Sequence, residues 1–112
     1  MKRDFSVELV SIGDVKLVDP KEQPLTLGSL VLEALLGQFQ DENLSGEEKF
    51  RRYQLAERIS KGGVQEVSAE EVSLIKLVVG KAYVPRFVGP AYLALEQDAV
   101  EPTTVGLLAD AA

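Results

Sequence analysis

The side chains that could carry out chemistry in this chain are mainly carboxylates, because its 112 residues include no His and no Cys. Histidine is the commonest general base near neutral pH, and cysteine supplies thiolate nucleophiles, disulfides and metal ligands. Their absence excludes Ser-His and Cys-His catalytic arrangements. The sequence also has no Gly-rich phosphate loop and no calcium-loop pattern. We therefore expect no metal site, no cofactor and no enzymatic activity.

Three pairs of adjacent acids are the remaining candidates for a chemical site, namely Asp41-Glu42, Glu47-Glu48 and Glu70-Glu71. Converging carboxylates can bind a hard cation or act as an acid/base pair. Each pair, however, lies near a predicted helix start, where negative charge complements the positive end of the helix dipole. We interpret these acids as helix-start residues and keep a carboxylate-dependent enzyme as an alternative.

A candidate binding surface surrounds two prolines within residues 81–92. Aromatic and Arg side chains are typical anchors of protein interfaces, and this segment contains both kinds. The alternative is that the aromatic side chains complete the core while the prolines turn the chain. Both interpretations stay open at this point. The hypothetical partner-binding residues are Tyr83, Arg86, Phe87 and Tyr92.

Two helices are predicted by the same local signal, a Ser followed three residues later by a Glu. One begins after Ser45 and runs to about Lys61, before a Gly pair, and the other begins after Ser68 and runs to about Tyr83. The core-facing residues expected on the first helix are Phe50, Tyr53, Ala56 and Ile59, and on the second Val72, Ile75, Val78, Val79 and Ala82. Ion pairs at i,i+4 are expected on the first helix. They are Glu47–Arg51, Glu48–Arg52 and Glu57–Lys61.

Residues 4–18 predict a β-hairpin that turns at Gly13 and Asp14. A two-residue loop pairs Ile12 with Val15 and Val10 with Leu17, so these four side chains would share one face. The opposite face would hold Phe5, Val7, Leu9 and Val18. Because both faces are partly apolar, the outer face or the free strand edge could contact a partner.

Residues Leu27–Leu36 predict a helix with Thr26 as N-cap and Gly37 at the C′ position. It is apolar on most sides, which indicates either a buried central helix or an oligomer interface. A short last helix is expected at residues 91–97, after breaks at Pro85 and Pro90. The fold class predicted is α+β, with an N-terminal hairpin packed on a small bundle of three to four helices.

The net charge of −6 comes from 12 basic and 18 acidic residues. An acidic chain disfavours nonspecific binding to nucleic acid or anionic membranes, which need basic surface. No apolar run approaches the roughly 18–20 residues that span a bilayer, and no signal peptide is predicted. Residues 98–112 hold three acids and no base. We expect one domain at residues 1–97, an acidic flexible tail at 98–112, and no membrane or nucleic-acid partner.

Several short stretches resemble a set of small proteins encoded by tailed bacteriophages and prophages, over residues 4–96. They are Pro24-Leu25-Thr26-Leu27-Gly28, Asn43-Leu44-Ser45-Gly46-Glu47-Glu48-Lys49, Ile75-Lys76 and Gly80-Lys81-Ala82-Tyr83. The resemblance implies a phage gene product in the cytoplasm of a bacterial host. It implies no catalytic or binding residues.

These observations together predict a non-enzymatic, phage-encoded accessory module that binds a host or phage protein. The basis is the lack of catalytic residue types, the excess of apolar helix surface, the free strand edge and the acidic tail. The alternative is a virion structural or assembly subunit, such as a tail chaperone or minor capsid component. That subunit would form a homo-oligomer through the helix Leu27–Leu36.

Overall fold

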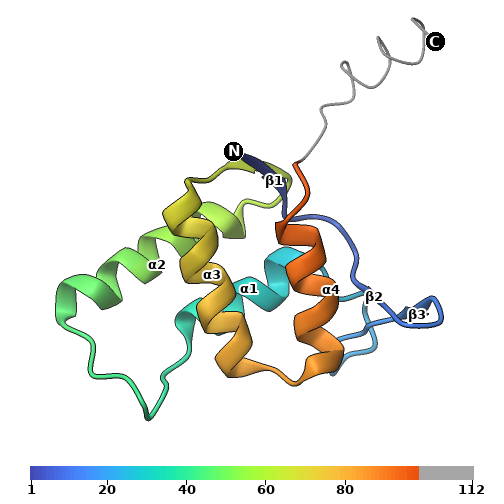
Figure 1. Cartoon of the computed structure of the whole chain (residues 1–112), viewed down its shortest axis with the longest axis horizontal. Coiled ribbons are helices and arrows are strands. Elements are labelled where there is room, and N and C mark those ends of the chain that lie inside the picture. Colours follow the sequence, from blue (N-terminus) through green and yellow to red (C-terminus); the bar gives the residue numbers. More distant parts are fainter. Residues whose placement is uncertain (99–112) are drawn as a thin grey trace, which may run out of the picture.

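The computed structural model describes residues 1–98, so the predicted tail at 98–112, apart from its first residue, lies outside the described residues. Within residues 1–98, four helices and four short strands form an α+β fold (Figure 1). The elements are β1 (Lys2–Asp4), β2 (Val10–Ser11), β3 (Val15–Lys16), α1 (Leu27–Leu36), α2 (Gly46–Ser60), β4 (Val64–Glu66), α3 (Ala69–Ala82) and α4 (Pro85–Leu95). The predicted fold class, with a hairpin beside a small helix bundle, is confirmed.

Helix α1 is the centre of the bundle and packs against α2, α3 and α4. The Thr26 hydroxyl caps it by accepting a hydrogen bond from the Ser29 amide at 3.1 Å. Leu27, Leu30 and Val31 are at most 1% exposed. Of the two interpretations of this apolar helix, the structure therefore shows the buried central one. Gly37 is itself the C-cap, with a φ of −76°, so its predicted C′ position is wrong.

The two predicted capping boxes are both present. The amide of Glu48 donates to the Ser45 hydroxyl at 3.1 Å, and the amide of Glu71 donates to the Ser68 hydroxyl at 3.0 Å. Each glutamate carboxylate in turn accepts from the backbone amide of its serine. Helix α2 ends as predicted, at a pair of glycines with positive φ.

The predicted inward face of α2 is wrong in its first half. Phe50 and Tyr53 are 59% and 55% exposed. The buried residues of α2 are Arg52, Leu55, Ala56 and Ile59. Their spacing of three, one and three residues is also that of a helical stripe, so the helix is rotated to place Arg52 inside.

The hairpin forms, but with a register one residue away from the predicted one. Val10 pairs with Lys16 and Ser11 with Val15, so the loop has three residues, 12–14. A shift of one residue exchanges the faces of a strand. Leu9 and Leu17 consequently both point into the core, whereas Ile12 is 96% exposed.

A third segment explains this register. The Leu9 amide donates to the Leu25 carbonyl, and the Leu25 amide donates to the Leu17 carbonyl, both at 2.9 Å. The Leu17 amide donates to the Leu9 carbonyl at 3.0 Å. These three backbone contacts fix two buried leucines opposite each other, a constraint that the turn residues alone do not reveal.

A second small sheet joins the start of the chain to the segment between α2 and α3. In this antiparallel pair of β1 and β4, Arg3 lies opposite Gln65. After β1 the chain passes very close to α1, because the Gly28 amide donates to the Phe5 carbonyl at 2.8 Å. A Cβ at position 28 would lie only 2.8 Å from the Phe5 carbonyl oxygen, so this contact requires glycine.

Helix α4 is longer than predicted, and the break predicted at Pro90 does not form. The helix begins with Pro85 at its first turn, where the missing N–H has no helical partner to lose. It then continues through Pro90, which deletes one backbone hydrogen bond. Ala91 and Leu95 are fully buried beyond that point. Their packing in the core offsets the lost hydrogen bond and holds the second half of the helix in place.

Candidate functional site

Two of the four predicted partner-binding residues lie together at the α3–α4 junction. The rings of Tyr83 and Phe87 are 5.9 Å apart between centroids and tilted by 48°. Both side chains are partly buried and pack against the core. The Tyr83 hydroxyl donates to the Leu30 carbonyl at 3.0 Å, and partial burial raises the pKa of this hydroxyl. These contacts stabilise the junction and leave little of either ring for a partner.

The other two residues are separated from this pair. Tyr92 lies against α3, where its hydroxyl donates to the Lys76 carbonyl at 2.5 Å and its ring lies 5.4 Å from the Lys76 ammonium. Arg86 is exposed and makes no hydrogen bond or ion pair within residues 1–98. A binding role for the four residues stays a prediction, although the three aromatic side chains do contribute to packing.

A surface groove lies between the C-terminal end of α1, the connection 37–45 and the N-terminal half of α2. We call it the α1–α2 groove. Its volume is about 560 Å³, inside the range of roughly 300–1,000 Å³ typical of binding clefts. Its lining residues are Leu35, Leu36, Gly37, Gln38, Phe39, Glu42, Asn43, Leu44, Gly46, Lys49, Phe50, Arg52 and Tyr53.

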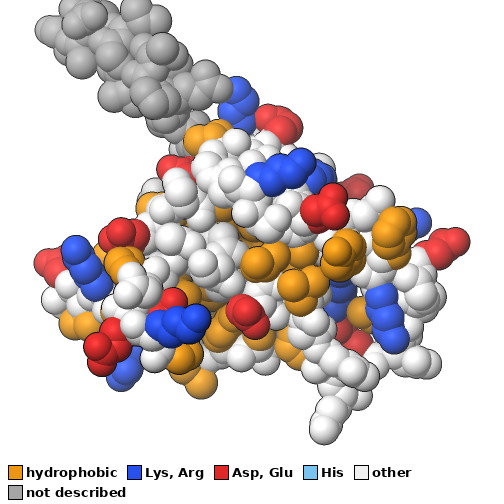
Figure 2. All heavy atoms as spheres, turned by 180° about the vertical axis from the view of Figure 1, so that it is seen from behind, with side chains coloured by type: hydrophobic (Ala, Val, Ile, Leu, Met, Phe, Trp, Pro, Cys, Tyr) orange, Lys and Arg blue, Asp and Glu red, His pale blue; other side chains and the backbone are white. Residues whose placement is uncertain are grey.

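Large apolar side chains are exposed along this groove. Phe50 and Tyr53 lie one helical turn apart on α2, and Leu36, which is 54% exposed, stands at the end of α1. Phe39 is partly buried and packs against the core. On the face seen in Figure 2, hydrophobic side chains form a band that extends toward the end of the molecule where α2 begins. The groove thus combines a hollow with exposed aromatic side chains.

Charged side chains fix the walls of the groove. The Arg52 guanidinium, 7% exposed, donates to both carboxylate oxygens of Glu42, at 2.8 and 2.7 Å. Lys81 of α3 lies 2.9 Å from an Asp41 carboxylate oxygen and 3.1 Å from Glu42. The hydrogen bond from Arg52 is the main reason that the pKa of Glu42 is lowered from 4.5 to about 2, despite some desolvation. The connection 37–45 is therefore tied to both α2 and α3.

The ion pairs predicted along α2 are wrong, and for the pair Glu48–Arg52 this network is the reason. Arg52 binds Glu42 of the preceding connection, while the Glu48 carboxylate completes the capping box at Ser45. The predicted pairs Glu47–Arg51 and Glu57–Lys61 do not form within the described chain. Sequence distance alone could not show that a carboxylate ten residues earlier would reach the guanidinium.

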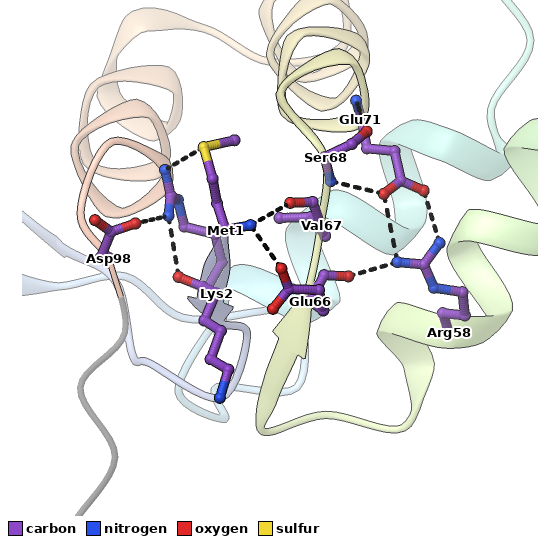
Figure 3. A network of polar contacts seen from close by, with 9 residues as sticks. Met1, Lys2, Arg58, Glu66, Val67, Ser68, Glu71 and Asp98 are labelled. Atoms are coloured by element: carbon purple, nitrogen blue, oxygen red, sulfur yellow. Dashed lines mark hydrogen bonds and ion pairs between the residues drawn. The ribbon is translucent and has the colours of Figure 1, made fainter. Parts of the chain in front are cut away.

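A second network joins α2 to the start of α3 (Figure 3). Arg58 donates to a Glu71 carboxylate oxygen at 2.6 Å and to the Glu66 carbonyl at 2.6 Å. Partial burial raises the pKa of Glu71, but the hydrogen bonds from Arg58 and Ser68 outweigh it and the pKa is lowered. The amine of Met1 lowers the pKa of the Glu66 side chain. All of these charges have partners, so the network indicates a structural role.

Arg3 is the other buried cation, 5% exposed. Its guanidinium donates to the Leu95 carbonyl at the end of α4 and to the Asp98 carboxylate. These contacts hold β1 against the end of α4. Within residues 1–98, no three acidic side chains are placed so that they could hold a metal ion.

The α1–α2 groove was missed at the level of sequence because Phe50 and Tyr53 were assigned to the core. The one signal for it in the helix is Leu55, a large aliphatic residue that the predicted face leaves out. Leu55 belongs to the stripe that begins at Arg52 and ends at Ile59. Choosing that stripe as the inward face would have placed both aromatic residues at the surface.

Comparison with known proteins adds no relative. No protein-family model, no curated protein and no solved structure matches this chain. In the described part of the chain, no helix is long and apolar enough to cross a membrane.

Proposed function

We propose that the chain is a non-enzymatic protein-binding accessory module, encoded by a phage or prophage and acting in the bacterial cytoplasm by binding a host or phage protein. The observation that carries the binding role is the α1–α2 groove, where Phe50 and Tyr53 are each more than half exposed. The phage origin and the cytoplasmic setting rest on the resemblance of short sequence stretches to small phage proteins. Aromatic side chains are enriched in protein interfaces and are frequent energetic anchors there.

The exposure of these rings favours a protein over a small molecule. Small-molecule sites typically enclose about 70–90% of the ligand surface, with aromatic side chains forming the walls. Here Phe50 and Tyr53 project from α2 into solvent beside the hollow. A partner that supplies its own extended surface would cover both rings at once.

The alternative is a virion structural or assembly subunit, such as a tail chaperone or minor capsid component. Its expected interface, α1, is largely buried in the core of the monomer and is not available for a second subunit. The outer side of the hairpin could replace α1, because Val10, Ile12 and Val15 are 42%, 96% and 58% exposed. This alternative therefore predicts self-association through the hairpin.

Site-specific photocrosslinking in bacterial cells, with and without phage infection, tests the proposal. A photoreactive phenylalanine analogue replaces Phe50, Ile12 or Leu93, the last an exposed residue of α4 that serves as the matched control. We expect a discrete adduct with one protein from position 50 and none from position 93. An adduct from position 12 with a second copy or with a virion protein would support the alternative. A folded protein that crosslinks at none of these positions would contradict the proposal.

A further inference from the structure

We infer that the α1–α2 groove binds a peptide segment of the partner that combines large apolar side chains with at least one acidic side chain. This inference rests on the proposed function and names the chemistry of the partner. The occupant is a segment of another protein, in which the apolar side chains enter the hollow and the acidic side chain meets the cation on its rim.

The apolar requirement follows from the walls of the groove. Leu36 and Phe39 border it on one side, and Phe50 and Tyr53 on the other. Water over these surfaces is displaced favourably by apolar groups, because the driving force scales with the apolar area buried. Two charged lining residues, Arg52 and Glu42, already form an ion pair with two hydrogen bonds. An apolar side chain that enters the groove therefore leaves neither of these charges without a partner.

The acidic requirement follows from the charge of the lining. The whole chain carries −6, yet the groove has two cations, Lys49 and Arg52, and one carboxylate, Glu42. Glu42 is held by both Arg52 and Lys81. Lys49 is exposed and has no ion-pair partner within residues 1–98. Opposite charge across an interface favours both encounter and register, so the complementary group is a carboxylate.

The position of Lys49 strengthens this assignment. It lies four residues before Tyr53, so the two side chains are neighbours on the same face of α2. The ion pairs of Lys81 and Arg52 also hold the connection 37–45 in place before any partner arrives. A groove whose walls are already ordered loses less conformational entropy on binding.

A displayed library of random short peptides, selected on the full chain at low salt, provides the probe. We expect selected sequences enriched in Leu, Phe, Ile or Met together with Asp or Glu. One of them, synthesised with a fluorophore, then gives dissociation constants by anisotropy. F50A and Y53A should each weaken binding by about tenfold or more, as for other interface anchors. K49E should weaken it at low salt, and the difference should shrink at high salt because screening weakens the charge contact.

The matched control is I12A, which removes an exposed apolar side chain outside the groove. It should change the dissociation constant by less than about twofold, as surface substitutions usually do. Circular dichroism confirms that each variant is folded. Phe50, Tyr53 and Lys49 are exposed, so their substitution leaves the core intact.

Several outcomes would overturn the inference. The inference would be wrong if the selected peptides were basic. It would also be wrong if they bound the F50A variant and the parent with equal affinity. If those peptides instead bind the I12A variant more weakly than the parent, the protein-binding function is supported and only the assignment of the binding site to the groove is wrong. Concentration-dependent self-association abolished by F50A would assign the groove to a second copy. Organic fragments that fill the groove while no peptide binds would assign it to a small molecule. No selected peptide together with no photocrosslink from position 50 would overturn both proposals.

Discussion

Helices α2 and α3 begin with the same sequence signal and differ in what they do next. Both carry a complete capping box, at Ser45 and Ser68. Helix α3 then buries most of its predicted inward face, with Ile75, Val78 and Val79 all at 0% exposure. Ala82 at its last turn is exposed, so its predicted place in the core is wrong. Helix α2 buries a cation and exposes two aromatic rings. The comparison teaches that a cap fixes where a helix starts, whereas its surroundings decide which side faces the core.

The surroundings of the two helices explain the difference. Helix α3 packs against α1 on one side and α4 on the other, whereas α2 packs mainly against α1 and lies at the edge of the bundle (Figure 1). A helix between two neighbours needs a broad apolar surface. A helix at the edge needs only a narrow stripe and leaves its remaining faces available for another molecule.

The largest loss of stability that this comparison predicts follows from truncating a core side chain of α3. Ile75→Ala should lower the free energy of unfolding by about 2–5 kcal/mol, the usual range for a fully buried isoleucine. Urea denaturation followed by circular dichroism measures the change. A loss below about 1 kcal/mol would show that α3 is no better packed than the exposed side of α2.

The next effect is the acid sensitivity of the α2 side of the molecule. Because the pKa of Glu42 is lowered in the fold from 4.5 to about 2, its contribution to stability is complete above pH 4.5 and is lost as the pH falls toward 2. Glu42→Gln should therefore be less stable than the parent at neutral pH, and the two should converge in acid. Urea midpoints measured across this range test it, with Glu47→Gln, in the first turn of α2, as the control. Parallel curves for parent and Glu42→Gln would contradict the assignment.

Much of the fold could be predicted from sequence because its signals are local. The bounds of α1 follow from Thr26 and a run of apolar residues, and both capping boxes follow from serine and glutamate at fixed spacing. The parts that could not be predicted depend on distant residues. The hairpin register is fixed by Leu25, and the continuation of α4 through Pro90 depends on burial of side chains beyond it.

The candidate site was less predictable for the same reason. The aromatic residues near Pro85 cluster in sequence, which is typical of an interface, but Tyr83 and Tyr92 donate hydrogen bonds to α1 and α3. The exposure of the two rings of α2 follows from the inward orientation of Arg52, for which the apolar pattern of the helix gives only a weak signal. That orientation depends on Glu42, a residue outside the helix.

Removal of the helix caps should cause a smaller loss of stability, which should be similar for α2 and α3. Ser45→Ala and Ser68→Ala each remove the side-chain acceptor of a capping box, which typically costs about 1 kcal/mol. We expect similar losses of stability from the two variants, because the cap acts locally whatever the helix packs against. Thermal and urea denaturation compare them. A loss at Ser68 several times that at Ser45 would show that the cap of α3 is coupled to its core packing.

The smallest effect on stability should come from the two rings that a partner is expected to cover. The double variant Phe50→Ala, Tyr53→Ala should change the free energy of unfolding by at most about 1 kcal/mol, since surface substitutions usually stay within about 0.5 kcal/mol each. Both side chains are more than half exposed, so little buried area is lost. Urea denaturation measures this change beside that of Ile75→Ala. A loss above about 2 kcal/mol would mean that the rings pack inward, and α2 would then resemble α3 in packing as well as in its cap.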